Sequence, residues 1–311
     1  MAINSFLQSL ENIICPPSLL VKAKKIKRLP RVAIAEAGTE VVMQSAKTAF
    51  EAGIMAPVFV GNKKEIFLAA KRLDWDIGGF DLVHSESEEE SANAAAKLCG
   101  AGEAEILMKG NVHSDKFIKA VITSKNKIRT SKRLIHVFYI TPKDGTEGVM
   151  VSDAAVNVVL NEKSKKRATL IVVELLKKIG IVRPKIAFLS ASESIIESMP
   201  STLEGKVLCD WSKENIKGAD FAGPLALDLI LSRQAAAIKG VKENRVSGRA
   251  NGIIVPDIVS GNALFKSLVY LSGGCAAGLV IGARVPLILT SRADPPAARL
   301  ASIALASISQ S

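Results

Sequence analysis

The sequence predicts an α/β protein with a parallel, doubly wound sheet, and three observations support this fold class. Apolar runs that suit buried strands alternate with helical patterns, as in 31–37, 39–52, 56–60 and 63–73. This order is typical of a parallel sheet with helices on both faces. Of all residues, 48% are hydrophobic and only 5% aromatic, so the core must be aliphatic. The length of 311 residues suggests two domains, or one large one.

The next elements place a cation at the mouth of a strand-to-helix turn. Acidic residues 85–90 open a helix, because acids in a first turn complement the helix dipole. Residues 105–108 form a strand that ends at Lys109-Gly110-Asn111, and a helix begins around Ser114. From the residues alone, Lys109 is either an exposed side chain or a contact for an anion.

The middle of the chain repeats the same architecture. The basic stretch 125–133 is the candidate crossing into a second domain. Beyond it we expect a hairpin, several helices and two further strands. The hairpin pairs 134–140 with 148–151, the helices are 164–178, one opened by 223–228 and one from 261, and the strands are 185–189 and 253–257.

The last strand-turn-helix is the most informative stretch for function. Residues 285–290 suit one buried parallel strand, and Asp294 with two prolines behind it begins a helix. Ser291 and Arg292 therefore lie where ligands bind in open α/β sheets, beside a helix amino end that favours anions. The prolines have no N–H to donate, so an anion here would depend on Arg292. The alternative is a surface turn whose arginine pairs with a carboxylate.

Composition excludes several classes of protein. The net charge of +11 fits an anionic substrate, and the densest basic cluster, 22–28, has no aromatic residue for stacking on nucleic acid. Four cysteines without a CxxC pair argue against zinc or disulfides and fit a reducing cytoplasm. No stretch reaches the roughly 20 apolar residues of a membrane span. The start has no basic residue and carries Glu11, so we expect a short amphipathic helix over 6–14 and no secretory signal. We therefore expect a cytoplasmic protein with neither nucleic acid nor a membrane as partner.

Five motifs resemble, in order, those of the phosphate acetyl/butyryltransferase family. They are LMKGNVHSDKFIKAVI (107–122), SDAAVN (152–157), GPLALD (223–228), VPDIVSGNALFKSLVY (255–270) and LVIGARVPLILTSRAD (279–294). The resemblance covers most of the chain from about Arg31 onward. It implies two doubly wound α/β domains of the isocitrate/isopropylmalate dehydrogenase type, with the active site in a cleft between them. The first domain would comprise 1–132 and 283–311, and the second 133–282.

The resemblance also implies the reaction and the residues that carry it. The family transfers a short acyl group reversibly between coenzyme A and phosphate (acetyl-CoA + phosphate = acetyl phosphate + CoA). Arg292 would hold the phosphate with bidentate hydrogen bonds, and Ser291 would stabilise charge developing on the carbonyl oxygen. The attacking group would be the thiol of coenzyme A in one direction and phosphate in the other, so no metal and no permanently bound cofactor is expected. A homodimer is implied. The residues implied to bind phosphate or coenzyme A are Lys109, Gly110, Asn111, Ser114, Asp257, Gly261, Asn262 and Lys266.

The sequence departs from the family pattern at acidic positions. Ala298 stands where the acetyl branch has a catalytic aspartate, and Ala222 and Arg249 stand where acids are common. This favours a butyryl-like subgroup but fixes neither the acyl chain (acetyl, propionyl or butyryl) nor the base for the thiol. Two alternatives stay open. A dehydrogenase of the same fold would need a cluster of metal-binding aspartates, which the sequence does not offer, and the lost acids would also suit a catalytically weakened anion-binding relative.

Overall fold

The computed structural model describes residues 6–10, 13–241, 244–290 and 294–310 and divides the chain into two compact units. The middle unit comprises Met1–Leu10 with Ile135–Ala276, and the outer unit comprises Glu11–Leu134 with Ala277–Ser311. The predicted domain ranges, 1–132 with 283–311 and 133–282, stay a prediction. They differ from the two units in placing residues 1–10 with the outer segments, and residues 133–134 and 277–282 with the middle one.

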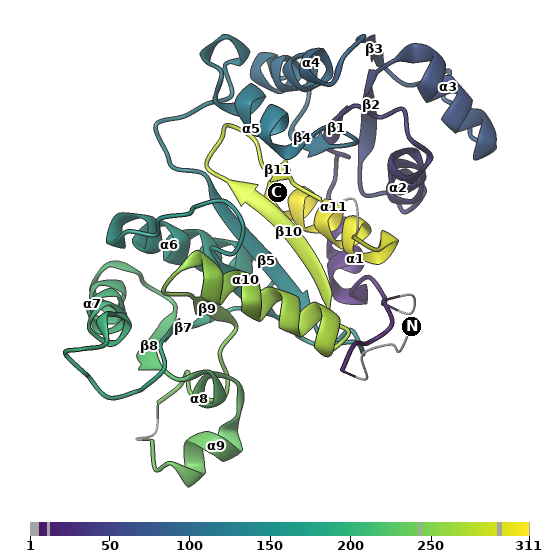
Figure 1. The fold of residues 1–311 in the computed structure, drawn as a ribbon. Coiled ribbons are helices and arrows are strands. Elements are labelled where there is room, and N and C mark those ends of the chain that lie inside the picture. The colour runs from purple at the N-terminus through teal and green to yellow at the C-terminus, as the bar shows by residue number, and fades with distance from the viewer. Residues whose placement is uncertain (1–5, 11–12, 242–243, 291–293, 311) are drawn as a thin grey trace. The chain divides into compact units, whose positions relative to one another are not determined.

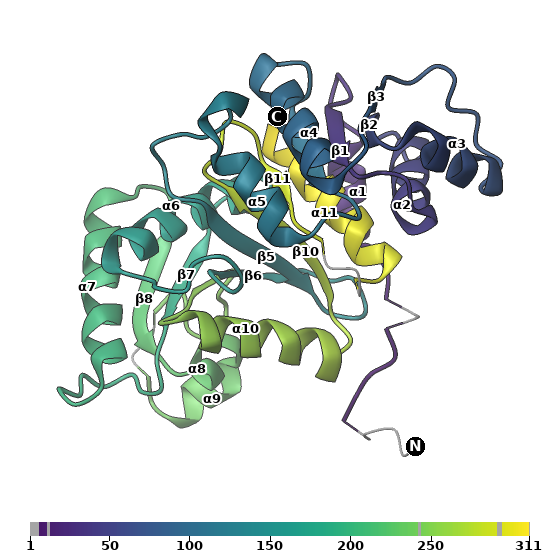
Figure 2. The ribbon, with the colours of Figure 1, turned by 45° about the horizontal axis from the view of Figure 1, so that its top comes forward.

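The outer unit is a twisted sheet whose strands follow the order β3-β2-β1-β4-β11-β10 (Figures 1 and 2). Neighbouring strands are parallel except for β10, which runs antiparallel to β11. The strands are β1 (Arg31–Ala35), β2 (Ala56–Gly61), β3 (Leu82–His84), β4 (Ile106–Lys109), β10 (Cys275–Ile281) and β11 (Leu287–Ile288). The first two residues of β10 belong to the middle unit. The helices are α1 (Pro17–Ala23), α2 (Glu40–Glu51), α3 (Lys63–Arg72), α4 (Glu88–Ala101), α5 (Ser114–Ile122), the short 3₁₀ helix η1 (Ser124–Asn126) and α11 (Pro296–Gln310).

The direction of winding in the outer unit reverses between β1 and β4. From β1 the chain passes through α2 to β2 and through α3 to β3, whereas α4 carries it back to β4 on the other side of β1. Such a reversal opens a crevice at the carboxyl ends of the two strands, where ligands bind in this class of sheet. We call this place the switch point.

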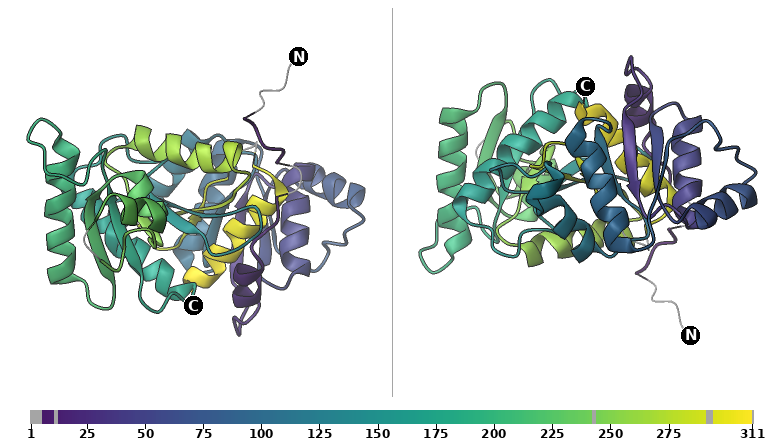
Figure 3. Two further views of the ribbon diagram at one scale, coloured as in Figure 1. Left: turned by 90° about the horizontal axis from the view of Figure 1, so that it is seen from below. Right: turned by 90° about the horizontal axis from the view of Figure 1, so that it is seen from above.

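Helix packing in the outer unit explains the apolar pattern near the C-terminus. Helix α11 packs against α1 and α2, and α4 packs against β1, β2 and β4 (Figure 3). All residues of 301–308 are buried, which is the pattern of a helix enclosed by neighbours rather than one with a solvent face.

The amphipathic helix predicted over 6–14 is wrong for the described part of that stretch. Residues 6–10 and 13–16 are irregular, and α1 begins at Pro17 with a proline in its first turn. Pro16 disfavours helical backbone in the residue before it, and a helix of nine residues is marginal without strong packing.

The middle unit has the strand order β5-β6-β9-β7-β8. Its first pair is antiparallel, which confirms the predicted hairpin, and the remaining neighbours are parallel. The strands are β5 (Ile135–Thr141), β6 (Val149–Ser152), β7 (Lys185–Leu189), β8 (Asp220–Leu225) and β9 (Gly252–Ile254). The helices are α6 (Glu162–Lys178), α7 (Pro200–Asn215), α8 (Leu227–Leu231), α9 (Arg233–Ile238), α10 (Ile258–Lys266) and the π-helical turn η2 (Ser267–Leu271).

The segment 223–228 corrects one prediction. Gly223, Pro224 and Leu225 end strand β8, and the helix begins only at Leu227. A proline is tolerated in a strand at the edge of a sheet, and β8 is the last strand of its order.

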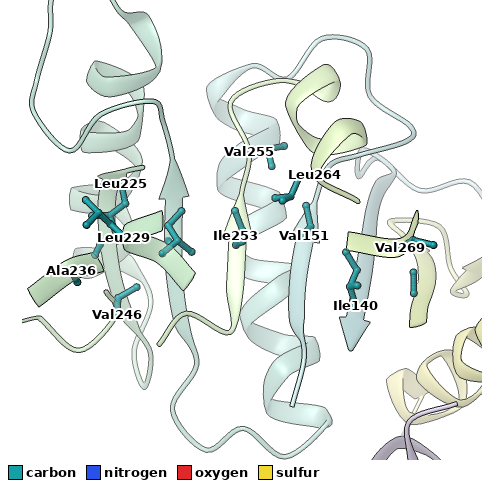
Figure 4. Packing of buried hydrophobic residues seen from close by; sticks show 14 residues of the cluster. Ile140, Val151, Leu225, Leu229, Ala236, Val246, Ile253, Val255, Leu264 and Val269 are labelled. Atoms are coloured by element: carbon teal, nitrogen blue, oxygen red, sulfur yellow. The ribbon is translucent and has the colours of Figure 1, made fainter. Parts of the chain in front are cut away.

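An aliphatic cluster forms the core of the middle unit, as the composition predicts (Figure 4). Side chains from β5, β6 and β9, such as Ile140, Val151 and Ile253, pack with Leu225, Leu229 and Leu264 from the flanking elements. No helix in the described ranges is both long and apolar enough to cross a membrane.

Candidate functional site

Residues 109–111 lie at the switch point, directly after β4. The N–H of Gly110 donates to the carbonyl oxygen of Ala35 at 2.8 Å, and the N–H of Asn111 donates to that of Glu36 at 2.9 Å. The Lys109 side chain is only 4% exposed, and its Nζ lies 3.4 Å from the carbonyl oxygen of Gly110. The sequence left open whether Lys109 is exposed; it is buried, which is rare for lysine outside a specific environment.

Glycine is required at position 110 by the close approach of β1. A Cβ at this position would lie 2.4 Å from the carbonyl oxygens of both Ala35 and Glu36. Glu36 itself has a φ of 58°, an uncommon backbone conformation for a residue other than glycine. Its carboxylate accepts a 2.6 Å hydrogen bond from Ser91 on α4, which fixes this turn. The loop after β4 is therefore held tightly against the end of β1.

A cavity of about 240 Å³ opens beside this loop. Thr290, at the carboxyl end of β11, donates from its hydroxyl to the carbonyl oxygen of Lys109 at 3.4 Å and so joins two strand ends. Threonine hydroxyls and the amide of Asn111 give the walls polar character beside two valines. The described lining residues are Thr39, Val41, Val42, Gly110, Asn111, Thr290 and Arg299.

Arg299 is a residue of this cavity that the sequence analysis missed. It lies in the first turns of α11, is 3% exposed, and donates from Nε to the carbonyl oxygen of Asp294 at 3.2 Å. Burial lowers the pKa of its guanidinium, and the nearby Asp294 opposes this shift. A single arginine inside an otherwise small and apolar helix was the signal available in the sequence.

Ser291 and Arg292, the predicted catalytic pair, lie outside the described residues. Their neighbours are described: Thr290 is buried at the end of β11, and α11 begins at Pro296. Ser114, predicted to contact a ligand, is the first residue of α5 and is exposed, and it is not among the described lining residues of the cavity.

The start of α5 is instead tied to α4 through Glu88. The Glu88 carboxylate accepts hydrogen bonds from the backbone N–H of His113 at 3.1 Å and from its Nδ1 at 2.7 Å, and Lys116 pairs with it at 3.3 Å. The hydrogen bond with the His113 ring is the main reason that the pKa of Glu88 falls to about 2.

The predicted binding residues of the middle unit have local structural roles. Asp257 caps α10 by accepting the N–H of Ser260 at 2.8 Å. A Cβ at Gly261 would lie 2.7 Å from the carbonyl oxygen of Asp153, and Asn262 donates to that of Ala154 at 3.0 Å. These contacts hold α10 against the SDAAVN segment. Lys266 is exposed at the last turn of α10.

Asp153, the acid of the SDAAVN segment, is 1% exposed and satisfied by four hydrogen bonds. It accepts from the backbone N–H groups of His136, Ala155 and Val156 and from the Asn157 side chain. Burial lowers the pKa of His136 to about 4, against the opposing effect of Asp153. Among the described residues, no group of three or more His, Cys, Asp and Glu side chains could hold a metal ion.

Comparison with known proteins adds independent findings. The family model described as phosphate acetyl/butaryl transferase matches residues 18–98 and 86–307. A phosphate acetyltransferase of Rhizobium meliloti is 35% identical over 93% of this chain and 92% of its own length. A phosphate butyryltransferase of Clostridium acetobutylicum is 33% identical over 93% of this chain and 96% of its own length.

Solved structures agree with the fold. A branched-chain phosphotransacylase from Enterococcus faecalis V583 superimposes with a TM-score of 0.78 at 26% identity, over 90% of this chain and 99% of that one. A 4-hydroxythreonine-4-phosphate dehydrogenase from Burkholderia phymatum gives a TM-score of 0.58 at 14% identity, over 91% and 99%, which shows the fold alone. The predicted α/β fold class is confirmed.

Proposed function

Because the chain belongs to the phosphate acetyl/butyryl transferase family, we propose that it transfers a short acyl group reversibly between coenzyme A and inorganic phosphate. In the forward direction acyl-CoA and phosphate give an acyl phosphate and free coenzyme A. One structural observation carries the proposal: Gly110 and Asn111, directly after Lys109, line a cavity at the switch point together with Thr290, the residue before Ser291.

The proposed chemistry needs an anion-binding pocket and a stabilised carbonyl oxygen. A phosphate oxygen attacks the thioester carbon, the C–O bond forms, and the C–S bond breaks to release the thiolate of coenzyme A, which takes up a proton. Lys109 and the Asn111 amide supply positive charge and hydrogen-bond donors at the phosphate side. Arg292 holds the phosphate, and Ser291 donates to the carbonyl oxygen as negative charge develops there.

Three of the chain's four thiols do not suit the role of nucleophile. Cys99 and Cys275 are buried, and burial raises the pKa of each to about 12. Burial also raises the pKa of Cys209. A thiol attacks as thiolate, so these groups are unreactive near neutral pH. This supports a direct transfer between the two substrates, without a permanently bound cofactor.

We also propose a cytoplasmic homodimer. None of the four cysteines, all of which lie in the described ranges, forms a disulfide, as is usual in a reducing compartment, and the family resemblance implies the dimer. Light scattering of the purified protein tests the dimer, with a monomeric mass as the contradicting result.

A panel of acyl-CoA substrates tests the reaction. We expect phosphate-dependent release of free thiol from acetyl-, propionyl- or butyryl-CoA. Ser291→Ala should lower kcat by about a hundredfold or more, as loss of one oxyanion donor does. Arg292→Ala should raise KM for phosphate. Full activity in both variants would refute the site, and no turnover of any short acyl-CoA by the wild-type protein would refute the function.

Neither acyl chain length is favoured by the relatives, since acetyl- and butyryltransferases match at 35% and 33% identity. The buried Ala298 leaves no carboxylate where the acetyl branch has one. The panel therefore decides acyl preference as well as activity.

A further inference from the structure

We propose that the side chain of Val42 on α2 is the acyl wall of the cavity at the switch point and sets how long an acyl chain the enzyme accepts. This inference rests on the proposed function, because it takes the acyl group of that reaction as the occupant of the cavity. The panel of acyl-CoA substrates measures chain preference, whereas the acyl wall is the side chain that limits it.

The polarity of the cavity suits an acyl group joined to a phosphoryl group. Most of the cavity surface is apolar. Among the described lining residues, Val41 and Val42 are the two whose side chains are purely hydrocarbon, whereas the polar side chains of Asn111 and Thr290 belong to the strand ends. Contact with the valines removes the methylenes of an acyl chain from water and so stabilises it in the cavity.

Val42 is a rigid part of this wall. It is 3% exposed and lies on a helix of twelve residues that packs against α3, α11 and β2. A valine in a helix has one strongly preferred rotamer, and a close-packed interior leaves it little room to move aside for a longer chain. Val41 is 58% exposed and therefore lies toward the open side of the cavity, where it limits the chain less.

The walls at the strand ends are fixed for other reasons. A Cβ at Gly110 would collide with the carbonyl oxygens of Ala35 and Glu36, and Thr290 is buried with its hydroxyl bonded to the Lys109 carbonyl oxygen. The volume of about 240 Å³ corresponds to about eight water molecules, which is room for a phosphoryl group with a short acyl chain but not for the whole of coenzyme A. In a cavity of this size, the volume of one side chain on α2 decides whether another methylene fits.

Substrate preference in Val42 variants tests this role. The measured quantity is the ratio of kcat/KM for hexanoyl-CoA to that for acetyl-CoA, which does not depend on the amount of folded enzyme. Val42→Ala enlarges the cavity and should raise the ratio by about tenfold or more, as one methylene in an apolar pocket does. Val42→Leu fills the cavity and should lower the ratio. Val121→Ala is the matched control, because Val121 is a similarly buried helical valine on α5 and is not among the described lining residues; it should keep the wild-type ratio.

Binding of alkylphosphonates separates this inference from the proposed function. Hexylphosphonate and methylphosphonate carry the phosphoryl oxygens and a hydrocarbon chain without a reactive carbonyl, so calorimetric titration of both needs no turnover. Their affinity ratio should shift toward the longer chain in Val42→Ala. If the wild type transfers no acyl group and this ratio still shifts, the proposed reaction is wrong and the acyl wall stands.

Unchanged ratios in both Val42 variants overturn the inference, as does an equal shift in Val121→Ala. A wild type that neither transfers an acyl group nor binds either phosphonate overturns it as well. If Val42→Ala does not fold, Val42→Leu decides, because a ratio no lower than that of the wild type is then the contradicting result.

Discussion

The outer and middle units place similar residues at the ends of parallel strands but use them differently. In the outer unit, Gly110 and Asn111 follow β4 and line a cavity. In the middle unit, Gly261 and Asn262 lie in α10 after β9, where they pack and hydrogen-bond against the SDAAVN segment. The end of a strand thus indicates where a polar group lies, whereas its local contacts decide whether it is available to a ligand.

Buried charge differs between the units in the same way. The middle unit buries the anion of Asp153 among four donors of its own chain, which completes its hydrogen bonding. The outer unit buries two cations, Lys109 at the end of β4 and Arg299 in the wall of the cavity. A buried anion with a full set of donors stabilises a loop, and buried cations beside a cavity are suited to an anionic substrate.

The largest effects are expected from alanine at the two close-packed glycines. Gly110→Ala would push the loop after β4 away from β1, because the new Cβ would lie 2.4 Å from two carbonyl oxygens. Displacing a binding loop far enough to relieve this clash lowers kcat/KM by about a hundredfold. Gly261→Ala should mainly lower the free energy of unfolding, by about 1–3 kcal/mol. Steady-state assays and urea unfolding of both variants measure the contrast.

Gly79→Ala is the control for both glycines, because a Cβ there meets nothing within 4 Å. The contrast between the units fails if Gly110→Ala keeps wild-type kcat/KM, or if Gly261→Ala loses as much activity as Gly110→Ala at unchanged stability.

Much of this contrast was predictable for the outer unit. Apolar runs bounded by turn residues marked β1, β2 and β4, and the βαβ order placed Lys109–Asn111 at a carboxyl edge. The burial of Arg299 was not predicted, because an arginine in an amphipathic helical pattern is expected to face solvent. Only the packing of α11 against α1 and α2 shows that Arg299 is enclosed. Burial of a cation depends on tertiary contacts that one-dimensional spacing does not contain.

The middle unit was less predictable for a chemical reason. Caps and ligand sites use the same residue types, so Asp257 in a motif fits either role until its hydrogen bonds are known. The prediction for 223–228 was wrong because apolar residues around a proline suit an edge strand as well as a helix start.

Removing the buried anion of the middle unit should lower its stability by an amount comparable to the effect of the glycine substitutions. Asp153→Ala leaves the N–H groups of His136, Ala155 and Val156 without their acceptor, and we expect a loss of about 3 kcal/mol in unfolding free energy. Asp144→Ala, in an exposed turn of the same unit, should change it by less than about 0.5 kcal/mol. A shift in the urea midpoint no larger for Asp153→Ala than for Asp144→Ala would contradict a structural role.

The two units should respond to acid in different pH ranges. The pKa of His136 falls from 6.5 to about 4 because the ring is buried, so below pH 6.5 the unfolded chain takes up a proton that the folded unit refuses. The contribution of neutral His136 to the free energy of unfolding is complete above pH 6.5 and is lost as the pH falls toward 4. The pKa of Glu88 falls from 4.5 to about 2, mainly through the His113 ring, so the outer unit loses that stability only between pH 4.5 and 2.

Hydrogen exchange followed by mass spectrometry resolves the two units during acidification. We expect strands of the middle unit to lose protection first, and His136→Phe to move that loss to lower pH. Earlier loss of protection in β1, β2 and β4 of the outer unit would reverse the expected order.

The smallest expected effect tests most directly whether a polar residue near a strand end binds substrate or only stabilises its own unit. Asp257→Ala removes the cap of α10 and should cost about 1 kcal/mol, with unchanged KM for phosphate and coenzyme A. Asn161→Ala is the matched variant, because Asn161 caps α6 through the N–H of Ser164 at 3.0 Å. If Asp257→Ala alone raises KM for coenzyme A, Asp257 binds substrate as well as capping its helix. The middle unit then contributes to the site, and the division of roles between the units is wrong.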